Sequence, residues 1–226
     1  MFDVTKLFKD RVDHNGAIYR CLRALKHPRE TIKAVRRRLS KSSIFSEEGE
    51  LFMCSLLPED LLTETILLFN PKTVLDVGCG TGKSLDYFLS RGLAAQGVEG
   101  SKLAISRAKN SSAILQWDLN KELNLQKKFD VIWCFEVAEH IHPDCVANFM
   151  KTLTNHSATI VMSAAHPGQG GEGHFNEQPR EYWLKAFSRY GYYHNDEANS
   201  KLQAVCNWNP DNLFVFQADA GKQAPR

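Results

Sequence analysis

The chain has 226 residues, 43% of them hydrophobic and 24% charged, a composition typical of a globular protein with a sizeable core. No run approaches the roughly 18 apolar residues of a membrane span, and residues 1–10 lack the apolar region of a secretory signal. Six scattered cysteines include no Cys-x-x-Cys pair, so the sequence predicts no zinc or redox motif of that type and favours a reducing, cytoplasmic location.

A basic arm opens the sequence, although the formal net charge of the chain is only +2. Residues 1–41 carry 12 Lys and Arg against 4 Asp and Glu, whereas the remaining residues carry 16 against 22. Such an arm either meets an anionic partner, such as nucleic acid, a phosphorylated substrate or a membrane surface, or forms a solvated helix face beside an acidic body. We favour the second interpretation, and the first stays open.

The apolar spacing in the first 70 residues predicts helices, within 16–39 and within 51–69, joined by a loop at 40–46. Pro58 suits the first turn of a new helix. From residue 72 onwards, strands and helices alternate. The expected strands are 73–77, 94–98, 113–116, 129–135, 158–162 and 213–216, and the expected helices are 83–90, 101–109, 143–153 and 181–190. This alternation predicts an α/β fold with a mostly parallel, buried, doubly wound sheet.

A glycine-rich turn follows the first of these strands and opens the next helix, in the sequence Asp76-Val77-Gly78-Cys79-Gly80-Thr81-Gly82. Glycine at every second position allows a sharp turn and a close approach of the backbone to a ligand. The spacing differs from the dinucleotide fingerprint Gly-x-Gly-x-x-Gly. It resembles motif I of class I methyltransferases, and the resemblance covers about residues 70–165. It implies a Rossmann-like, seven-stranded domain over 71–226 that binds S-adenosylmethionine, preceded by an N-terminal helical extension over 1–70, of which residues 51–69 would form a lid over the cofactor.

The resemblance also implies which residues contact the cofactor. Asp76 would help to hold the methionine end, Glu99 at the tip of the second strand would accept hydrogen bonds from the ribose hydroxyls, and Asp118 would contact the adenine amino group. The expected cofactor-binding residues are Asp76, Gly78, Cys79, Gly80, Gly82, Glu99, Gly100, Trp117, Asp118, Phe135 and Glu136. The alternatives are an ordinary surface Glu for Glu99 and a capping Asp for Asp118. Because three acidic residues follow their strands in the expected order, we favour the cofactor site.

A second motif, Glu136-Val137-Ala138-Glu139-His140, follows the fourth strand. It is similar to the Glu-x-x-Glu-His of ubiquinone-pathway O-methyltransferases and small-RNA 2′-O-methyltransferases, which bind a divalent metal with one more, distant His. The resemblance implies Mg²⁺ or Mn²⁺ on Glu136, Glu139, His140 and His174, where the metal would lower the pKa of a substrate hydroxyl. His166 competes with His174 for the fourth position, and the run 168–173 departs from those families.

Two other interpretations of this motif stay open. Acidic residues at a helix start are favoured by the helix dipole alone. Alternatively, His174 or His140 acts as a metal-free general base. Arg180 or Tyr182 would line the acceptor pocket, whereas Trp183 and Phe187 have the spacing of core residues and His142 that of a helix entry.

The sequence therefore predicts a methyltransferase that transfers the methyl group in line to a hydroxyl of a small molecule or sugar. The glycine-rich loop 168–173, after the fifth strand, would close over that acceptor. RNA methylation is the alternative that the basic arm favours, although no RNA-binding module is recognisable. A non-catalytic domain that binds the cofactor and a partner protein is the third possibility. The oligomeric state is left open.

Overall fold

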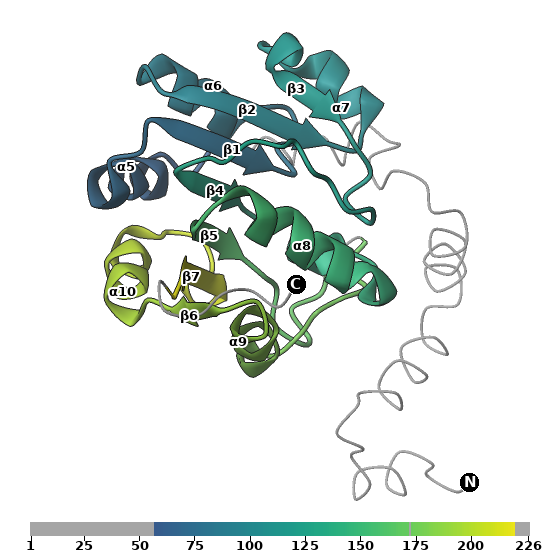
Figure 1. Ribbon diagram of the computed structural model, residues 1–226, viewed down its shortest axis with the longest axis vertical. Helices are drawn as coiled ribbons and strands as arrows, with labels where there is room; N and C mark the ends of the chain where they lie inside the picture. The colour runs from purple at the N-terminus through teal and green to yellow at the C-terminus, as the bar shows by residue number, and fades with distance from the viewer. Residues whose placement is uncertain (1–56, 172, 220–226) are drawn as a thin grey trace, which may run out of the picture. The chain divides into compact units, whose positions relative to one another are not determined.

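The computed structural model describes residues 57–171 and 173–219, which form one sheet covered by helices on both faces (Figure 1). The sheet has seven strands within this part of the chain, in the order β3-β2-β1-β4-β5-β7-β6. The strands are β1 (Thr73–Val77), β2 (Ala94–Glu99), β3 (Ile114–Gln116), β4 (Val131–Cys134), β5 (Thr159–Ser163), β6 (Tyr192–His194) and β7 (Leu213–Ala218). Strands β1 to β5 pair in parallel, and β7 runs antiparallel between β5 and β6. The strand order reverses between β1 and β4, which is where open α/β sheets bind their ligands.

The helices pack on the two faces of the sheet because side chains of each strand alternate between those faces. The helices are α5 (Glu59–Phe69), α6 (Lys83–Ser90), α7 (Lys102–Arg107), α8 (Val146–His156), α9 (Arg180–Ser188) and α10 (Asp196–Val205). Val74 of β1 packs in the same cluster as residues of α5, α6 and α10, whereas Leu75 packs with residues of α8 and α9. Both faces are therefore buried, as expected for a parallel sheet.

The elements expected from the sequence between residues 72 and 190 are confirmed, with shifts of a few residues at their ends. Strand β1 and helix α6 have the expected bounds, and β7 extends to Ala218. The segment expected as one helix from residue 143 is a 3-10 turn, Pro143–Cys145, followed by α8. Strand β6 and helix α10 were not among the elements expected from the sequence.

Helix α5 begins at Glu59, after Pro58 as predicted, and ends with Asn70 in the left-handed conformation. Leu61 and Leu62 of this helix are buried in the core cluster that includes residues of α6 and α10. Three features expected from the sequence lie outside the described residues. They are the helices within 16–39, the loop at 40–46 and the basic arm of residues 1–41. A lid formed by residues 51–69 thus stays a prediction. No helix of the described part of the chain is long and apolar enough to span a bilayer.

Candidate active site

The glycine-rich turn lies at the carboxyl end of β1. Gly78, Gly80 and Gly82 have φ angles of 75°, 54° and 77°, in the left-handed region that favours glycine. The backbone amides of Gly78 and Cys79 donate to the carbonyl of Val98 at 2.8 and 3.1 Å, which fixes the turn to β2. A Cβ on Gly78 would lie 2.4 Å from Cγ2 of Val137. This position therefore requires glycine, and it places the turn directly against the segment that follows β4.

Two buried carboxyl groups lie beside this turn. Burial and the nearby Glu99 raise the pKa of Asp76 to about 8, and Oδ2 of Asp76 has no hydrogen-bond partner among the described residues. Glu99 accepts a hydrogen bond from the amide of Gly80 at 2.9 Å and another from the amide of Ser101 at 2.7 Å. Burial raises the pKa of Glu99, and these amides counter that effect in part. The glycine turn and a buried carboxyl group with one unpartnered oxygen fit a ligand that carries a cationic group.

The segment after β3 carries the two residues expected at the adenine end. Oδ1 of Asp118 accepts from both the amide and the side chain of Asn120, so it caps this turn, and Nε1 of the half-buried Trp117 donates to the carbonyl of Lys121. A Cβ on Gly100 would lie 3.4 Å from the carbonyl oxygen of Trp117, so the segments after β2 and β3 lie close together. The turn-capping role and the expected adenine contact are compatible, and the second stays a prediction.

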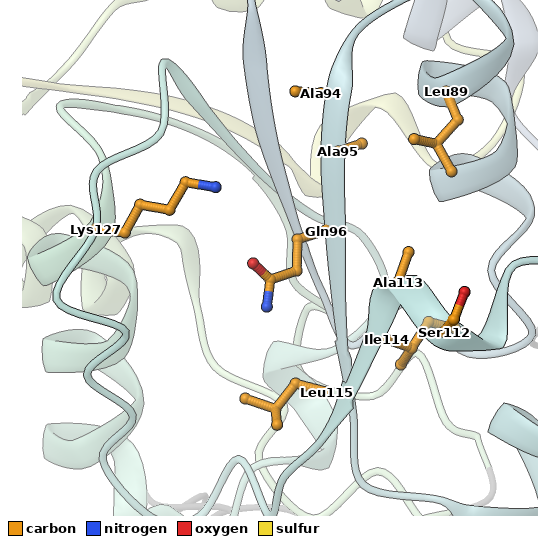
Figure 2. A pocket seen from close by; sticks show the side chains of 9 residues that line it. All are labelled: Leu89, Ala94, Ala95, Gln96, Ser112, Ala113, Ile114, Leu115 and Lys127. Atoms are coloured by element: carbon orange, nitrogen blue, oxygen red, sulfur yellow. The ribbon is translucent and has the colours of Figure 1, made fainter.

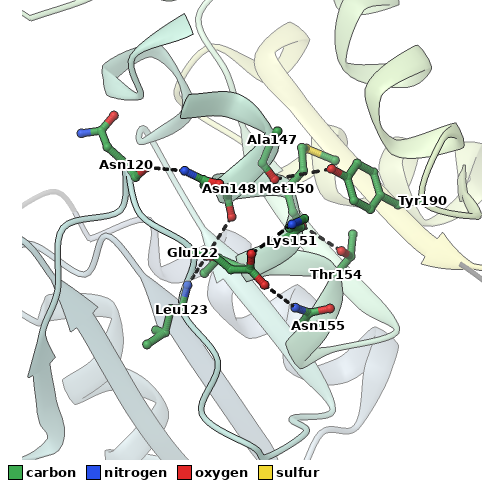
Figure 3. A network of polar contacts seen from close by, with 11 residues as sticks. Asn120, Glu122, Leu123, Ala147, Asn148, Met150, Lys151, Thr154, Asn155 and Tyr190 are labelled. Carbon is green, nitrogen blue, oxygen red and sulfur yellow. Dashed lines mark hydrogen bonds and ion pairs between the residues drawn. The ribbon is translucent and has the colours of Figure 1, made fainter. Parts of the chain in front are cut away.

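A polar network attaches the segment after β3 to helix α8 (Figure 3). The side chain of Asn148 donates to the carbonyl of Asn120, and Lys151 forms an ion pair with Glu122 at 3.1 Å. The side chain of Asn120 also accepts a hydrogen bond from the amide of His142. The segments that follow β3 and β4 are thereby held at fixed positions on the same edge of the sheet.

The segment after β4 begins with Phe135 and Glu136, both expected at the cofactor. The ring of Phe135 stacks on Trp133, with 5.4 Å between centroids, and packs toward the core that α5 and α10 cover. Glu136 has a φ of 56°, which is unusual for a residue other than glycine and is often found at functional sites. Ser163 of β5 holds it, since its Oγ accepts from the amide of Glu136 at 2.6 Å and donates to the carboxylate at 2.8 Å.

Glu139, His140 and His174 form a cluster in which one ligand atom from each residue lies within 4.8 Å of the others. Glu139 is fully buried, and neither carboxylate oxygen has a hydrogen-bond partner among the described residues. Burial and the charge of Glu136 raise the pKa of Glu139 to about 8. Burial and the neighbouring His174 lower the pKa of His140 to about 4. A buried carboxyl group whose oxygens accept no hydrogen bond of normal geometry, next to two imidazoles, fits a site for a divalent cation.

The cluster exists because residues 173–176 are attached to the 3-10 turn Ala138–His140 by four hydrogen bonds. The amides of Phe175 and Asn176 both donate to the carbonyl of Glu139, at 3.1 and 3.0 Å. The side chain of Asn176 donates to the carbonyl of Ala138 at 3.1 Å, and Nδ1 of His140 bonds to the carbonyl of Gly173 at 3.1 Å. His174, which is 34 positions after His140 in the sequence, is thus held beside Glu139 and His140.

Two residues considered for the metal set from the sequence are not part of this cluster. His166 is exposed and bonds to the carbonyl of the next residue, so of the two candidate histidines the structure brings only His174 to the cluster. Glu136 bonds to Ser163 instead. His142 caps the 3-10 turn before α8, as expected for a helix-entry residue.

The two residues expected in the acceptor pocket make internal contacts. The guanidinium of Arg180 donates to the carbonyl of Leu213, contacts His194 at 2.8 Å and lies over the ring of Phe214. Tyr182 packs edge-on against Trp183 and belongs to the border of the core. Trp183 and Phe187 are fully buried core residues, as expected.

Three residues of the site, Ser163, Asn176 and Glu177, were missed by the sequence analysis. Asn176 and Glu177 lie between the glycine-rich loop 168–173 and the helix expected from residue 181. Asn176 and Glu177 follow His174 by two and three residues in the sequence. This spacing indicates a role in the site only once the turn after β4 is known to lie beside them.

A hollow of about 500 Å³ lies away from this site (Figure 2). It is lined by the first residues of β2, Ala94 to Gln96, by residues at the start of β3 and by Lys127. The glycine turn follows the carboxyl end of β1, whereas this hollow lies at the amino end of β2, where β3 does not yet pair with it. It is therefore separate from the glycine turn.

Comparison with known proteins agrees with this fold. Residues 45–195 match the model of a methyltransferase domain family. Residues of the chain are 36% identical over 80 positions to the ubiquinone biosynthesis O-methyltransferase of Coxiella burnetii. That match covers 32% of this chain and 34% of the relative, so the chain spans about a third of the length of the curated relatives it matches.

Solved structures share the fold at low sequence identity. The methyltransferase domain of the bacterial protein CtHen1 has a TM-score of 0.54 and 21% identity, over 72% of this chain and 98% of that one. The sugar N-methyltransferase KedS8 from Streptoalloteichus has a TM-score of 0.59 and 18% identity, over 76% and 93%. A Burkholderia thailandensis N1-methyltransferase solved with S-adenosylhomocysteine has a TM-score of 0.56 and 15% identity, over 85% and 91%.

The sheet order, the glycine turn and these structures define a class I methyltransferase fold. Since the family model covers residues 45–195, the chain belongs to the methyltransferase domain family. Its domain is of the kind that depends on S-adenosylmethionine as methyl donor.

Proposed function

We propose that this protein transfers a methyl group from S-adenosylmethionine to a hydroxyl group of a small molecule or a sugar. The observation that carries the proposal is the cluster of Glu139, His140 and His174 beside the glycine turn. Val137, two residues before Glu139, is the residue against which Gly78 packs. Groups able to handle a hydroxyl proton therefore lie near the segment expected to hold the cofactor, which is the arrangement that in-line transfer requires.

The residues of the cluster suit Mg²⁺ or Mn²⁺, because these ions accept carboxylate oxygen and imidazole nitrogen. Glu139, His140 and His174 would hold the ion, whereas one carboxylate oxygen of Glu136 accepts from Ser163. Such an ion lowers the pKa of a hydroxyl group bound to it. The matching relatives named as O-methyltransferases support an oxygen acceptor.

The other residues of the site would position the reactants. The glycine turn, with Asp76 and Glu99 beside it, would hold the cofactor, and the burial of Asp76 and Glu139 would strengthen their electrostatic interactions with the reactants. Without a metal, His174 or His140 would accept the proton of the hydroxyl group as a general base.

RNA methylation is the alternative, supported by the basic arm of residues 1–41. An affinity for RNA that falls steeply with salt would favour it over a small acceptor. For the third possibility, a non-catalytic domain, a screen for transfer of a radioactive methyl group would stay blank despite tight binding of the cofactor.

The decisive experiment is calorimetric titration of Mn²⁺ into the protein saturated with S-adenosylhomocysteine. We expect stoichiometric binding that is lost in His174→Ala and retained in His166→Ala, the matched control. Equal affinity of S-adenosylhomocysteine for all three proteins would show that the fold is intact. Failure of the wild type to bind Mn²⁺ would exclude the metal, and methyl transfer that resists a chelator but is lost in His174→Ala would then identify the base.

A further inference from the structure

Glu177 lies between the glycine-rich loop 168–173 and helix α9, and only 17% of its side chain is exposed. Its Oε2 accepts a hydrogen bond from the amide of Gly168 at 2.8 Å, and its Oε1 accepts one from the amide of Gly170 at 2.7 Å. Oε1 also lies 3.3 Å from Nδ1 of His174. One carboxylate thus connects the loop to a residue of the cluster.

Two glycines of the loop, Gly168 and Gly170, have no packing around them that would fix their conformation. Gly168 and Gly170 have φ angles of 87° and 74°, and a Cβ on either would meet nothing within 4 Å. A Cβ on Gly171 would lie 2.4 Å from Nε2 of His174, so the imidazole rests against the backbone of the loop. The position of the ring therefore depends on the conformation of the loop, which the hydrogen bonds to Glu177 hold together with one from the side chain of Asn212 to that of Gln169.

We propose that Glu177 is a positioning residue, which holds the glycine-rich loop in place and fixes the orientation and tautomer of His174. The inference rests on the proposed function, in which His174 is part of the reaction centre. A carboxylate that accepts from Nδ1–H places the proton on that nitrogen and leaves Nε2 to act as ligand or base. Carboxylate partners of this kind are typical of histidines that bind metals.

Glutamine cannot replace this carboxylate. The carboxylate offers acceptors on both oxygens, whereas the amide of glutamine has one oxygen, and its NH₂ group would face the amide of Gly168 or Gly170 donor to donor. Glutamine also either donates to or accepts from Nδ1 of His174, so it does not select one tautomer. Glu177→Gln keeps the size of the side chain and removes the proposed role.

The first test uses nitrogen-15 NMR of the full chain, at a pH at which the ring of His174 is neutral. We expect the Nδ1–H tautomer and slow amide exchange at Gly168 and Gly170 in the wild type. In Glu177→Gln we expect a mixture of tautomers and exchange about tenfold faster or more at these two glycines, since their hydrogen bonds to a charged group are lost. Glu181→Gln, which changes an exposed carboxylate on α9, should behave as the wild type. Unchanged tautomer and exchange in Glu177→Gln would overturn the inference.

The second test separates this inference from the proposed function. If the wild type binds Mn²⁺, Glu177→Gln should bind it about 10–100-fold more weakly, as is usual when a partner of a ligating histidine is removed, with the affinity of S-adenosylhomocysteine unchanged. Equal Mn²⁺ affinity and an unchanged tautomer would refute the role of Glu177 and leave the proposed function intact. If the wild type binds no Mn²⁺ but Glu177→Gln alters the tautomer and the exchange, the metal is excluded and the positioning role is retained.

Discussion

Ser163, the last residue of β5, bonds to Glu136 twice: its hydroxyl accepts from the amide of Glu136 and donates to the carboxylate. Ser163 is buried, and Glu136 adopts a left-handed backbone conformation that costs energy for a residue with a Cβ. These two bonds therefore stabilise the conformation that turns the chain after β4 toward the cluster.

Replacement of this serine is expected to destabilise the fold. In Ser163→Ala the amide of Glu136 is left without a partner in a partly buried position, which costs about 1–3 kcal/mol. Urea unfolding should show a lower midpoint, with the slope unchanged. Ser188→Ala is the control, because that exposed hydroxyl bonds only to the carbonyl of Lys185 in its own helix. A midpoint for Ser163→Ala equal to that of the control would contradict the role of this contact.

Replacement of Gly78 is expected to affect both the fold and the cofactor site. Gly78→Ala introduces a Cβ at 2.4 Å from Val137 as well as a left-handed alanine. Gly92→Ala is the matched control, since Gly92 has a φ of 81° and open space around it, so only the backbone cost of about 1–2 kcal/mol applies. We expect Gly78→Ala to unfold at lower urea than Gly92→Ala. In calorimetric titration it should bind S-adenosylhomocysteine at least about tenfold more weakly than the wild type, which corresponds to about 1.4 kcal/mol.

A double variant identifies the cause of that loss. Val137→Ala removes the two methyl groups that the new Cβ would meet, so Gly78→Ala with Val137→Ala should recover part of the affinity lost in Gly78→Ala. Failure to recover any affinity would mean that the left-handed backbone, rather than the contact with Val137, sets the requirement for glycine.

The sequence predicted the fold where the apolar pattern is strong. Strands β1, β4 and β5 are short, apolar and buried, and each is followed by a helix, so their order along the chain was sufficient. Strand β6 has only three residues, and the ring of Tyr193 is half exposed, so no alternation was visible. Helix α10 buries only Ala198, Asn199 and Leu202, too few for an apolar stripe.

Residue type and position at or after the end of a strand were sufficient to single out Asp76, Glu99 and Glu139, and their contacts with a cofactor or metal stay predictions. His174 was expected in the cluster with His166 as the competitor, and the sequence alone did not decide between them. The decision depends on hydrogen bonds between the turn Ala138–His140 and residues 173–176, which are long-range contacts without a local pattern. Glu177 was missed for the same reason, since its partners are backbone amides.

The carboxyl group of Asp76 should make the stability of the unliganded protein depend on pH. Its pKa is raised to about 8 in the fold from 3.8, so the neutral form is favoured in the folded state. This contribution to stability is complete below pH 3.8 and is lost progressively as the pH rises through about 8. We expect urea midpoints of the wild type to fall between pH 5 and pH 8 more than those of Asp76→Asn.

The control for this pH effect is Asp60→Asn, which changes an exposed carboxylate on α5 and should keep the pH dependence of the wild type. Asp76→Asn should also bind S-adenosylhomocysteine more weakly, because the expected partner of its cationic group is lost. An Asp76→Asn protein with the pH dependence of the wild type would show that another group causes it.

Asn176 is expected to be essential for assembly of the cluster. Its buried side chain donates to the carbonyl of Ala138, which also accepts from the amide of Ile141, and it accepts from the side chain of Gln178 at 3.0 Å. Asn176→Ala therefore removes two hydrogen bonds, each of which contributes about 0.5–1.5 kcal/mol. Asn155→Ala, which removes an exposed amide from α8, is the control. We expect Asn176→Ala to lower the urea midpoint and, if Mn²⁺ binds to the wild type, to weaken that binding, because His174 is then no longer held beside Glu139. A variant that loses stability but keeps the wild-type Mn²⁺ affinity would show that the two backbone bonds to Glu139 are sufficient to hold His174 in place.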